Sequence, residues 1–312
     1  MTTFSIVIPL YNKENHIGET LKSALSQTFN DFEIVIVNDG STDNSIEKVK
    51  AFDDPRIKLF TQQNSGAAAA RNLGIQQANS KLIAFLDADD IWFENHLEEL
   101  SRLQKNFPGC GMYCSRYYIR TSKNSTFKMS YINSITENFR GIIPDYFDAS
   151  LINRVGLTSA IAIPKEILKD DLLFNPEVSS GQDLELFTKI ALQFPTAITD
   201  KYTFEYNFAV ENQLSKTPIT KKKLLDLDQF CEAEKTNPSL KKFLDNYRKE
   251  YALHYKIAGD YKRSKELYQK ANPENISQKF KILYALPRMV LISLLSIKRF
   301  LLKKGFDFRV YN

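Results

Sequence analysis

The first ninety residues alternate between two periods of hydrophobicity, and no other feature constrains the fold as strongly. Short apolar runs rich in β-branched residues predict buried strands, while the segments between them carry apolar residues at helical spacing. The expected strands are residues 4–10, 32–37, 56–60 and 82–86, and the expected helices are residues 14–27, 46–52 and 67–78. This order predicts an α/β protein with a mostly parallel, doubly wound sheet.

Polar residues follow three of the expected strands at the point where each strand ends. They are Pro9-Leu10-Tyr11-Asn12 after the first strand, Asn38-Asp39-Gly40-Ser41-Thr42-Asp43 after the second, and Asp87-Ala88-Asp89-Asp90 after the fourth. In open α/β sheets, ligands bind beside the carboxyl ends of the strands. The three clusters are therefore predicted to meet at one ligand-binding crevice.

The acidic cluster after the fourth strand has two interpretations. Alternate residues leaving a strand can bring the carboxylates of Asp87 and Asp89 to one point, where Mg²⁺ or Mn²⁺ would relieve their repulsion. Alternatively, these acids cap a helix that begins near Phe93, because Asp is favoured at helix N-termini. The position of the cluster beside two other polar strand ends favours the metal.

Three further residues are ambiguous when the sequence is considered alone. Asp39 could accept hydrogen bonds from a nucleotide base, but Asp-Gly is also a common turn. Arg71 follows an alanine run that would pack tightly on the sheet, so it either points toward the crevice or is a solvated helix residue. Asp183 begins an expected helix, where an acid is normally a cap.

Glycine-rich phosphate-binding motifs are absent from the sequence. Neither a dinucleotide fingerprint nor a GxxxxGK(S/T) loop occurs. The charge of a bound phosphate group would therefore have to be handled mainly by the metal.

The sequence blocks described above, taken in their order along the chain, closely resemble those of the family 2 glycosyltransferases, whose catalytic domain has the GT-A fold. The resemblance is strong over residues 1–107 and partial to about 215. The matching blocks are Ile6-Val7-Ile8-Pro9-Leu10-Tyr11-Asn12, Val37-Asn38-Asp39-Gly40-Ser41-Thr42-Asp43, Gly66 with Ala70-Arg71-Asn72, Phe85-Leu86-Asp87-Ala88-Asp89-Asp90 with Trp92, and more weakly Ser179-Ser180-Gly181-Gln182-Asp183. It implies a Rossmann-like nucleotide-diphospho-sugar transferase domain.

The resemblance implies roles for the residues around the nucleotide. Pro9 and Tyr11 would line the nucleotide pocket, chiefly through their backbone. Asp39 would read the uracil edge of a UDP-sugar, and Arg71 would make a second contact to that base.

It also implies roles around the donor sugar. Asp87 would face the ribose and the sugar, and Asp89 would bind Mn²⁺ or Mg²⁺ bridging the diphosphate. Asp183 occupies the place of the catalytic base. The family usually has Glu-Asp there, whereas this chain has Gln182-Asp183. The loss of the neighbouring carboxylate should lower the pKa of Asp183.

These roles describe an inverting, metal-dependent glycosyltransferase that moves a sugar from a UDP-sugar to a hydroxyl of a glycan or lipid-linked acceptor by direct displacement. Two alternatives remain. A haloacid-dehalogenase-like phosphohydrolase also uses Asp-x-Asp after a strand with Mg²⁺, but it leaves Asp39, Arg71 and Asp183 without a role. A non-catalytic nucleotide-sugar-binding protein would account for Gln182, and it predicts UDP binding without turnover.

Charge is distributed unevenly along the chain. Residues 1–215 have 20 basic and 27 acidic side chains, whereas residues 216–312 have 22 and 10, so a net charge of −7 is followed by one of +12. A uniformly basic nucleic-acid binder would not have this division, and no nucleic-acid partner is expected. The division predicts a catalytic domain over residues 1–215 and a basic helical region over residues 216–312.

The basic region is expected to be helical to its end. Helical spacing occurs over residues 224–230, 240–255 and 261–271, with a turn at Gly259-Asp260. The segment 282–302 contains an apolar run, residues 289–297, that is flanked by Arg288 and by Lys298-Arg299 and is too short to span a bilayer.

This final segment has two interpretations of its own. It suits a helix lying at an anionic membrane surface, or a helix packed on the catalytic domain. The apolar run 4–10 has no basic stretch before it, so no secretory signal is expected. We therefore expect a cytoplasmic protein that is peripheral on the inner face of the membrane.

Overall fold

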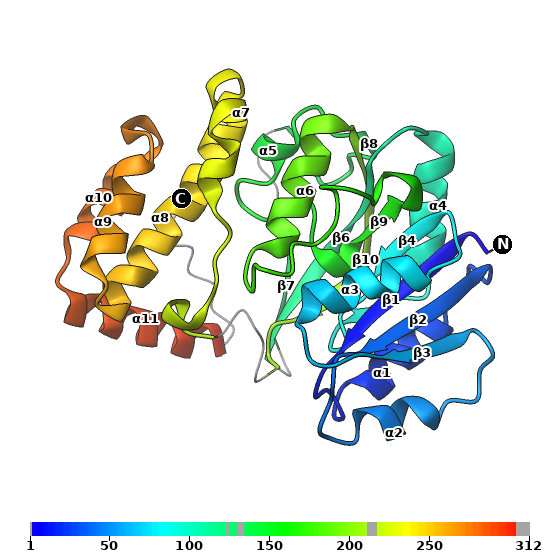
Figure 1. The fold of residues 1–312 in the computed structure, drawn as a ribbon. Coiled ribbons are helices and arrows are strands. Elements are labelled where there is room, and N and C mark those ends of the chain that lie inside the picture. Colours follow the sequence, from blue (N-terminus) through cyan, green and yellow to red (C-terminus); the bar gives the residue numbers. More distant parts are fainter. Residues whose placement is uncertain (1, 123–124, 130–133, 211–216, 304–312) are drawn as a thin grey trace.

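A ten-stranded sheet forms the centre of the molecule in a computed structural model that describes residues 2–122, 125–129, 134–210 and 217–303 (Figure 1). Within those residues the strands follow the order β3-β2-β1-β4-β9-β6-β10-β5, with β7 on β6 and β8 on β10. The strands are β1 (Phe4–Leu10), β2 (Phe32–Asn38), β3 (Ile57–Thr61), β4 (Leu82–Phe85), β5 (Ile91–Trp92), β6 (Met112–Ser122), β7 (Ser125–Lys128), β8 (Gly141–Ile142), β9 (Ile161–Pro164) and β10 (Thr196–Asn207).

Helices connect and cover these strands. They are α1 (Ile17–Leu25), α2 (Ser45–Lys50), α3 (Ala67–Gln77), α4 (His96–Asn106), α5 (Tyr146–Ala149), α6 (Gln182–Gln193), α7 (Cys231–Thr236), α8 (Pro238–Ala258), α9 (Tyr261–Lys270), α10 (Gln278–Ala285) and α11 (Arg288–Lys303). The predicted α/β class is confirmed, and each strand expected in the first ninety residues is present within one residue of its predicted ends.

The first half of the sheet is parallel, as predicted, and the second half is mixed. Strands β1, β2, β3 and β4 pair in parallel. Strand β9 then lies antiparallel between β4 and β6, and β10 returns parallel to β6. The sequence of the first ninety residues contains only the parallel unit, so its alternation could not predict the reversal at β9.

Helix α1 is shorter than the predicted segment 14–27 because its ends are held by other loops. The backbone N–H of Lys13 donates to Ser45 Oγ at 2.8 Å, and that of Glu14 donates to Asp43 Oδ2 at 3.0 Å. At the other end, Gln27 Nε2 donates to the carbonyl of Phe93 at 2.9 Å. These bonds tie the residues on either side of α1 to neighbouring segments.

Helix α3 lies unusually close to β1. A Cβ added at Gly74 would come within 2.4 Å of Val7 Cγ1, so only glycine allows this approach. Ala70, one turn earlier, is fully buried. The close contact fixes the neighbouring Arg71 at the carboxyl end of the parallel strands.

The C-terminal helices form a second hydrophobic cluster beside the sheet (Figure 1). Helix α8 belongs to both parts of the molecule. Phe243 near its start packs against Phe147 of α5 with 5.6 Å between ring centroids, whereas Leu253 near its end packs in the second cluster with Phe280 and Leu291. The predicted domain boundary at residue 215 lies outside the described residues, and α8 joins the two predicted regions by packing on both.

The predicted helices of this region are confirmed except at two places. The helical hairpin with its turn at Gly259 is present, and Gly259 has the left-handed φ of 93°. The expected helix 224–230 was wrong: Leu225 N donates to the carbonyl of Ser180, and only Leu227–Phe230 forms a 3-10 turn. The segment 282–302 is also not continuous, because Pro287 separates α10 from α11.

A helix that crosses a bilayer needs about 20 mostly apolar residues. Among the described helices, none is long and apolar enough to cross a membrane alone. Helices α10 and α11 meet the requirement only as a pair, and they are bent by 117° at the break between them.

Candidate active site

One cavity of about 710 Å³ lies at the carboxyl ends of β1, β2 and β4. It is also bordered by the start of α6, by the segment before β9, and by α8. All seven site residues predicted from the sequence line it, namely Pro9, Tyr11, Asp39, Arg71, Asp87, Asp89 and Asp183. The structure therefore brings together residues separated by up to 174 positions in the chain, counted from Pro9 to Asp183.

Two cations pair with the carboxylates that follow β4. Arg71 Nη2 lies 2.6 Å from Asp87 Oδ1, and Lys13 Nζ lies 2.7 Å from Asp89 Oδ2. Sequence reasoning missed Lys13, which comes directly after the first polar cluster. Its position there, one residue beyond Asn12, was the available signal.

Asp90 has a structural role that differs from those of its two neighbours. It is 1% exposed, and its carboxylate accepts hydrogen bonds from Ser159 Oγ at 2.6 Å and from the backbone N–H of Asn207 at 3.0 Å. Burial, and then the charges of Asp89 and Asp87, raise the pKa of Asp90 well above its usual value. Asp90 thus joins the loop after β4 to the loop before β9 and to the end of β10.

The capping interpretation of this acidic cluster was wrong. Helix α4 begins at His96 and its N-cap is Asn95, so no carboxylate of Asp87, Asp89 or Asp90 caps it. Residues Ile91–Trp92 form β5 instead, antiparallel to β10. The acids consequently lie at the cavity and not at a helix end.

Asp39 is held in place by three donors. Gln62 Nε2 and the backbone N–H of Ser65 donate to its Oδ1 at 2.7 and 2.8 Å, and the backbone N–H of Gly66 donates to its Oδ2 at 2.9 Å. A carboxylate has about four acceptor sites. These bonds therefore leave one site, on Oδ2, for a donor in the cavity. The sequence left a turn residue and a ligand contact as alternative roles for Asp39. The two roles are compatible, because Asp39 holds the turn and still has a free acceptor site.

Arg71 is buried, so the solvated alternative was wrong. Its side chain is 6% exposed, and its guanidinium lies 5.2 Å from the centroid of the Phe174 ring. Within the described part of the chain, its Nε and Nη1 have no hydrogen-bond partner. A buried guanidinium with spare donors at a cavity wall is suited to a polar ligand.

Asp183 lies in the first turn of α6 and faces an arginine. Arg154 Nη1 is 2.7 Å from its Oδ2, and its Oδ1 accepts the backbone N–H of Leu184 at 2.8 Å. Burial alone would raise the pKa of Asp183, but the charges of Arg154 and then Arg71 outweigh it, so the pKa lies below its usual value. Asp183 is 17% exposed, which leaves it accessible from the cavity.

Further lining residues come from segments that the sequence did not connect with the site. Arg154 belongs to the irregular segment before β9, and Tyr247, Glu250 and Tyr251 belong to α8. Their spacing of three and four places these α8 residues on one helix face. That face was visible in the sequence, but nothing there indicated that it meets the cavity.

The chemistry of the donor set limits what metal the cavity could hold. In the described ranges, no three His, Cys, Asp or Glu side chains are grouped so as to hold an ion by themselves. Mg²⁺ and Mn²⁺, however, typically take one or two protein carboxylates and complete their coordination with phosphate and water. Asp89, with Asp87 two residues away, fits that requirement when a diphosphate supplies the other oxygens.

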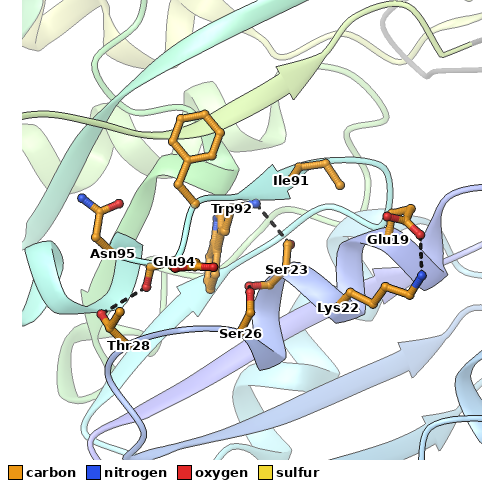
Figure 2. Close-up of a pocket in the computed structure, with 10 residues that line it drawn as sticks. Glu19, Lys22, Ser23, Ser26, Thr28, Ile91, Trp92, Glu94 and Asn95 are labelled. Carbon is orange, nitrogen blue, oxygen red and sulfur yellow. Dashed lines mark hydrogen bonds and ion pairs between the residues drawn. The ribbon is translucent and has the colours of Figure 1, made fainter.

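A second depression, also of about 710 Å³, lies elsewhere and contains none of the predicted site residues (Figure 2). Glu19, Lys22 and Ser23 of α1 face the β5 segment across it, and the backbone N–H of Trp92 donates to Ser23 Oγ at 3.2 Å. Lys22 and Glu19 pair with each other at 2.7 Å and are mostly exposed. This depression lies where α1 packs against the β5 segment, and among the described residues that line it there is no buried charged side chain that could bind a ligand.

The fold is similar to that of the GT-A glycosyltransferase TarS. Residues 1–349 of TarS from S. aureus in complex with UDP-GlcNAc superpose with a TM-score of 0.64 at 17% identity, covering 97% of this chain and 90% of that one. Another crystal structure of TarS 1–349 gives a TM-score of 0.57 at 20% identity over 86% and 90%. At these identities the likeness concerns the fold alone. The family is decided by sequence: the model of glycosyl transferase family 2 matches residues 5–163, and the chain belongs to that family.

Curated relatives are similar over the same region. An uncharacterised glycosyltransferase, RC0461 of Rickettsia conorii, is 36% identical over 197 residues, which are 61% of this chain and 30% of that protein. WfgD of Escherichia coli, named as a UDP-Glc:alpha-D-GlcNAc-diphosphoundecaprenol beta-1,3-glucosyltransferase, is 45% identical over 104 residues, 33% of this chain and 41% of that protein. The chain spans less than half the length of these relatives.

Proposed function

We propose that this protein transfers a sugar from a UDP-sugar to a hydroxyl group of an acceptor, with inversion at the anomeric carbon. The observation that carries the proposal is the meeting of Asp39, Asp89 and Asp183 in one cavity. These three carboxylates come from the loops after β2 and β4 and from the first turn of α6, and they have different surroundings, which suits three different tasks. Family membership and the predicted roles of these positions agree with it.

Recognition of the nucleotide is proposed to fall to Asp39 and Arg71. The remaining acceptor site on Asp39 Oδ2 suits the N–H on the edge of a uracil ring, which is a donor. The spare donors of the Arg71 guanidinium suit the carbonyl oxygens of the same base. Pro9 and Tyr11 border this part of the cavity. Support comes from TarS, whose structure contains UDP-GlcNAc, and from WfgD, whose name specifies UDP-Glc.

Asp89 is proposed to hold Mn²⁺ or Mg²⁺ together with the donor diphosphate. Its ion pair with Lys13 uses Oδ2, and among the described residues Oδ1 has no protein hydrogen-bond partner. When bound, the cation would act as a Lewis acid that stabilises negative charge on the departing diphosphate. Lys13 brings a second positive charge to the same place, and Asp87, oriented by Arg71, would face the ribose and donor sugar.

Asp183 is proposed as the general base. It would accept the proton of the acceptor hydroxyl while that oxygen forms a bond to the anomeric carbon and the bond from that carbon to the diphosphate oxygen breaks. The proton ends on Asp183 and the electron pair leaves with UDP. One displacement reverses the anomeric configuration once.

The acceptor is proposed to enter between α6 and α8. Tyr247, Glu250 and Tyr251 border the cavity on the side of Asp183, and tyrosine faces suit sugar rings. A glycan or a lipid-linked saccharide would be the acceptor, and the name of WfgD includes a diphosphoundecaprenol acceptor. The alternative functions, a phosphohydrolase and a non-catalytic binding protein, are not favoured. A phosphohydrolase would have no use for Asp39, and a non-catalytic binding protein would have no use for Asp183.

The proposal is tested by following UDP release and the product together. Wild-type protein should release UDP from a UDP-sugar in the presence of Mn²⁺ and an acceptor, and the product should have the anomeric configuration opposite to that of the donor. Nuclear magnetic resonance of the anomeric proton reports that configuration. A retained configuration would remove Asp183 from the role of a single base, and phosphate release from small phosphoesters would support the phosphohydrolase.

A further inference from the structure

Helix α11 presents an apolar face to the surroundings of the molecule. Five of its apolar side chains are strongly exposed, and they are Met289 (69%), Val290 (41%), Leu294 (42%), Ile297 (53%) and Phe300 (60%). At ~100° per residue they fall within roughly 140° of the helix circumference. We call these five residues the α11 face.

The opposite side of α11 holds the helix on the rest of the protein. Leu291 is 2% exposed and packs in the second hydrophobic cluster with Leu253 and Phe280. Arg288 Nε at the start of α11 donates to the carbonyl of Ile257 in α8 at 2.9 Å. The α11 face is therefore the outer side of a docked helix, and its exposure does not result from an unpacked core.

The sequence segment that contains this face carries charge of one sign only. Between Glu274 and Asp307 the sequence contains seven Lys or Arg residues and no Asp or Glu, the seven being Lys279, Lys281, Arg288, Lys298, Arg299, Lys303 and Lys304. Lys281, Arg288 and Arg299 are exposed in the structure. An apolar face on a cationic segment complements a bilayer interface, where anionic headgroups cover apolar acyl chains.

We propose that the α11 face docks on an anionic lipid bilayer, with α11 lying in the plane of the interface. The apolar side chains would enter the boundary between headgroups and acyl chains, while the surrounding lysines and arginines would contact acidic headgroups. A protein partner with an apolar groove would not require seven cations without one acid. The cytoplasmic leaflet, which carries negative surface potential, is the membrane face that suits these charges.

Docking in this way would also determine where the cavity is held. Helix α8 provides Tyr247, Glu250 and Tyr251 to the cavity wall and, one turn later, Leu253 and Ile257 to the contacts with α11. A rigid helix thus connects the membrane-facing surface with the acceptor side of the cavity. The relevance of this link to a lipid-linked acceptor rests on the proposed function, whereas the docking itself does not.

The test uses full-length protein and vesicles of phosphatidylcholine with about one third phosphatidylglycerol, compared with phosphatidylcholine alone. Flotation should recover wild-type protein with the anionic vesicles only, and recovery should fall as salt is raised. The double variant Leu294→Glu/Ile297→Glu should lose binding at least tenfold. The matched control Leu192→Glu replaces an exposed leucine of α6 and should bind like wild type.

A second pair of variants examines the charge. Lys281→Glu/Arg299→Glu should weaken flotation, while Lys48→Glu/Lys50→Glu, on the exposed side of α2, should leave it unchanged. Thermal unfolding and UDP binding, measured on every variant, verify that folding and the cavity are intact, so failure of the docking proposal is distinguishable from failure of the proposed function.

Three outcomes would overturn docking. The first is that the Leu294→Glu/Ile297→Glu variant floats with anionic vesicles as well as wild type does. The second is a dimer that this variant dissociates, with no flotation of the wild type, because a second copy would then cover the face. The third is binding that resists alkaline carbonate extraction, because α10 and α11 would then be inserted across the bilayer and not lie on it.

Discussion

Arg154 holds Asp183 by an ion pair of 2.7 Å between Nη1 and Oδ2. The two residues are 29 positions apart, and they come from an irregular segment and from the first turn of α6. The pair keeps the carboxylate ionised at the cavity wall, and it also makes that carboxylate a weaker base. Arg154 is accordingly a positioning residue for the proposed base.

Removing the charge of Arg154 should move the acid limb of the pH–rate profile. The pKa of Asp183 is lowered against burial by Arg154 and Arg71, so Arg154→Gln should raise it. A base must be ionised to accept a proton, and the pH at which kcat falls on acidification should therefore rise. Arg154→Lys retains the charge and should move the limb less. A profile for Arg154→Gln that coincides with wild type would contradict this role, whereas a merely structural loss would lower kcat without moving the limb.

Replacing Asp183 itself should separate binding from turnover. Asp183→Asn keeps the size of the side chain and its bond to Leu184 N, but it cannot take the acceptor proton. We expect kcat to fall by about 10²–10⁴-fold with UDP affinity close to wild type. Steady-state UDP release and calorimetric UDP titration provide the two measurements. Unchanged turnover would assign the base to another residue.

Asp39 should determine the preference for uracil over cytosine. Its remaining acceptor site suits the ring N–H of uracil, whereas the corresponding cytosine nitrogen is itself an acceptor. Asp39→Asn introduces a donor there, so the ratio of UDP to CDP affinity should decrease by about tenfold or more. Competition of both nucleotides in calorimetry measures this ratio. Equal loss of both affinities would indicate that Asp39 only shapes the loop around Gly66.

Glu33 should contribute to stability that depends on pH. Burial would raise its pKa, but Lys58, Ser5 and the backbone of Asn79 outweigh burial and lower it from 4.5 to about 2. Because the folded-state pKa is the lower one, the contribution is complete above pH 4.5 and is lost as pH falls toward 2. The shift corresponds to roughly 3–4 kcal/mol in the free energy of unfolding. Urea unfolding of Glu33→Gln should be less pH-dependent across this window than that of wild type. Parallel curves for the two proteins would refute the assignment.

Asp245 should hold the C-terminal helices together. It is fully buried in α8 and pairs with Lys241 at 2.8 Å and Arg248 at 3.0 Å, and its Oδ2 accepts Asn275 Nδ2 at 2.7 Å. Asp245→Ala leaves Arg248 and Lys241 with Glu234 as their remaining close anion, at 2.6 and 3.4 Å, and removes the acceptor of Asn275 Nδ2. We expect a loss of about 3 kcal/mol in the free energy of unfolding.

A control for that variant is Glu232→Ala, which removes an exposed partner of Lys235. It should change the free energy of unfolding by less than about 1 kcal/mol. Chemical denaturation of the two variants compares them directly, and a similar effect of both would mean that the buried network adds little.

The parallel half of the fold was predictable because its central strands β1, β2 and β4 are buried on both faces. Most of their positions are therefore apolar, as at the fully buried Ile6 and Ile8 of β1, and this produces the nearly continuous apolar runs seen in the sequence. The mixed half depends on β9 inserting between β4 and β6, a tertiary choice that local periodicity does not contain.

The same distinction applies to the site. Its seven predicted residues lie at strand ends or in the first two turns of a helix, where local pattern and family resemblance coincide. Arg154 and the α8 residues Tyr247 and Tyr251 reach the cavity only through packing of distant segments, so no local pattern marks them. Lys13 lay beside a recognised cluster, but its partner Asp89 is 76 residues away.

The central claim is that one cavity binds a UDP-sugar with its metal at Asp89. Thermal unfolding of wild type and Asp89→Asn, measured with a panel of nucleotide sugars with and without Mn²⁺, tests it most directly. We predict that UDP-sugars raise the Tm of wild type more with Mn²⁺ than without it, and that Asp89→Asn loses the Mn²⁺-dependent part. Stabilisation by other nucleotides and not by UDP compounds, or a Mn²⁺ effect that Asp89→Asn retains, would contradict the account.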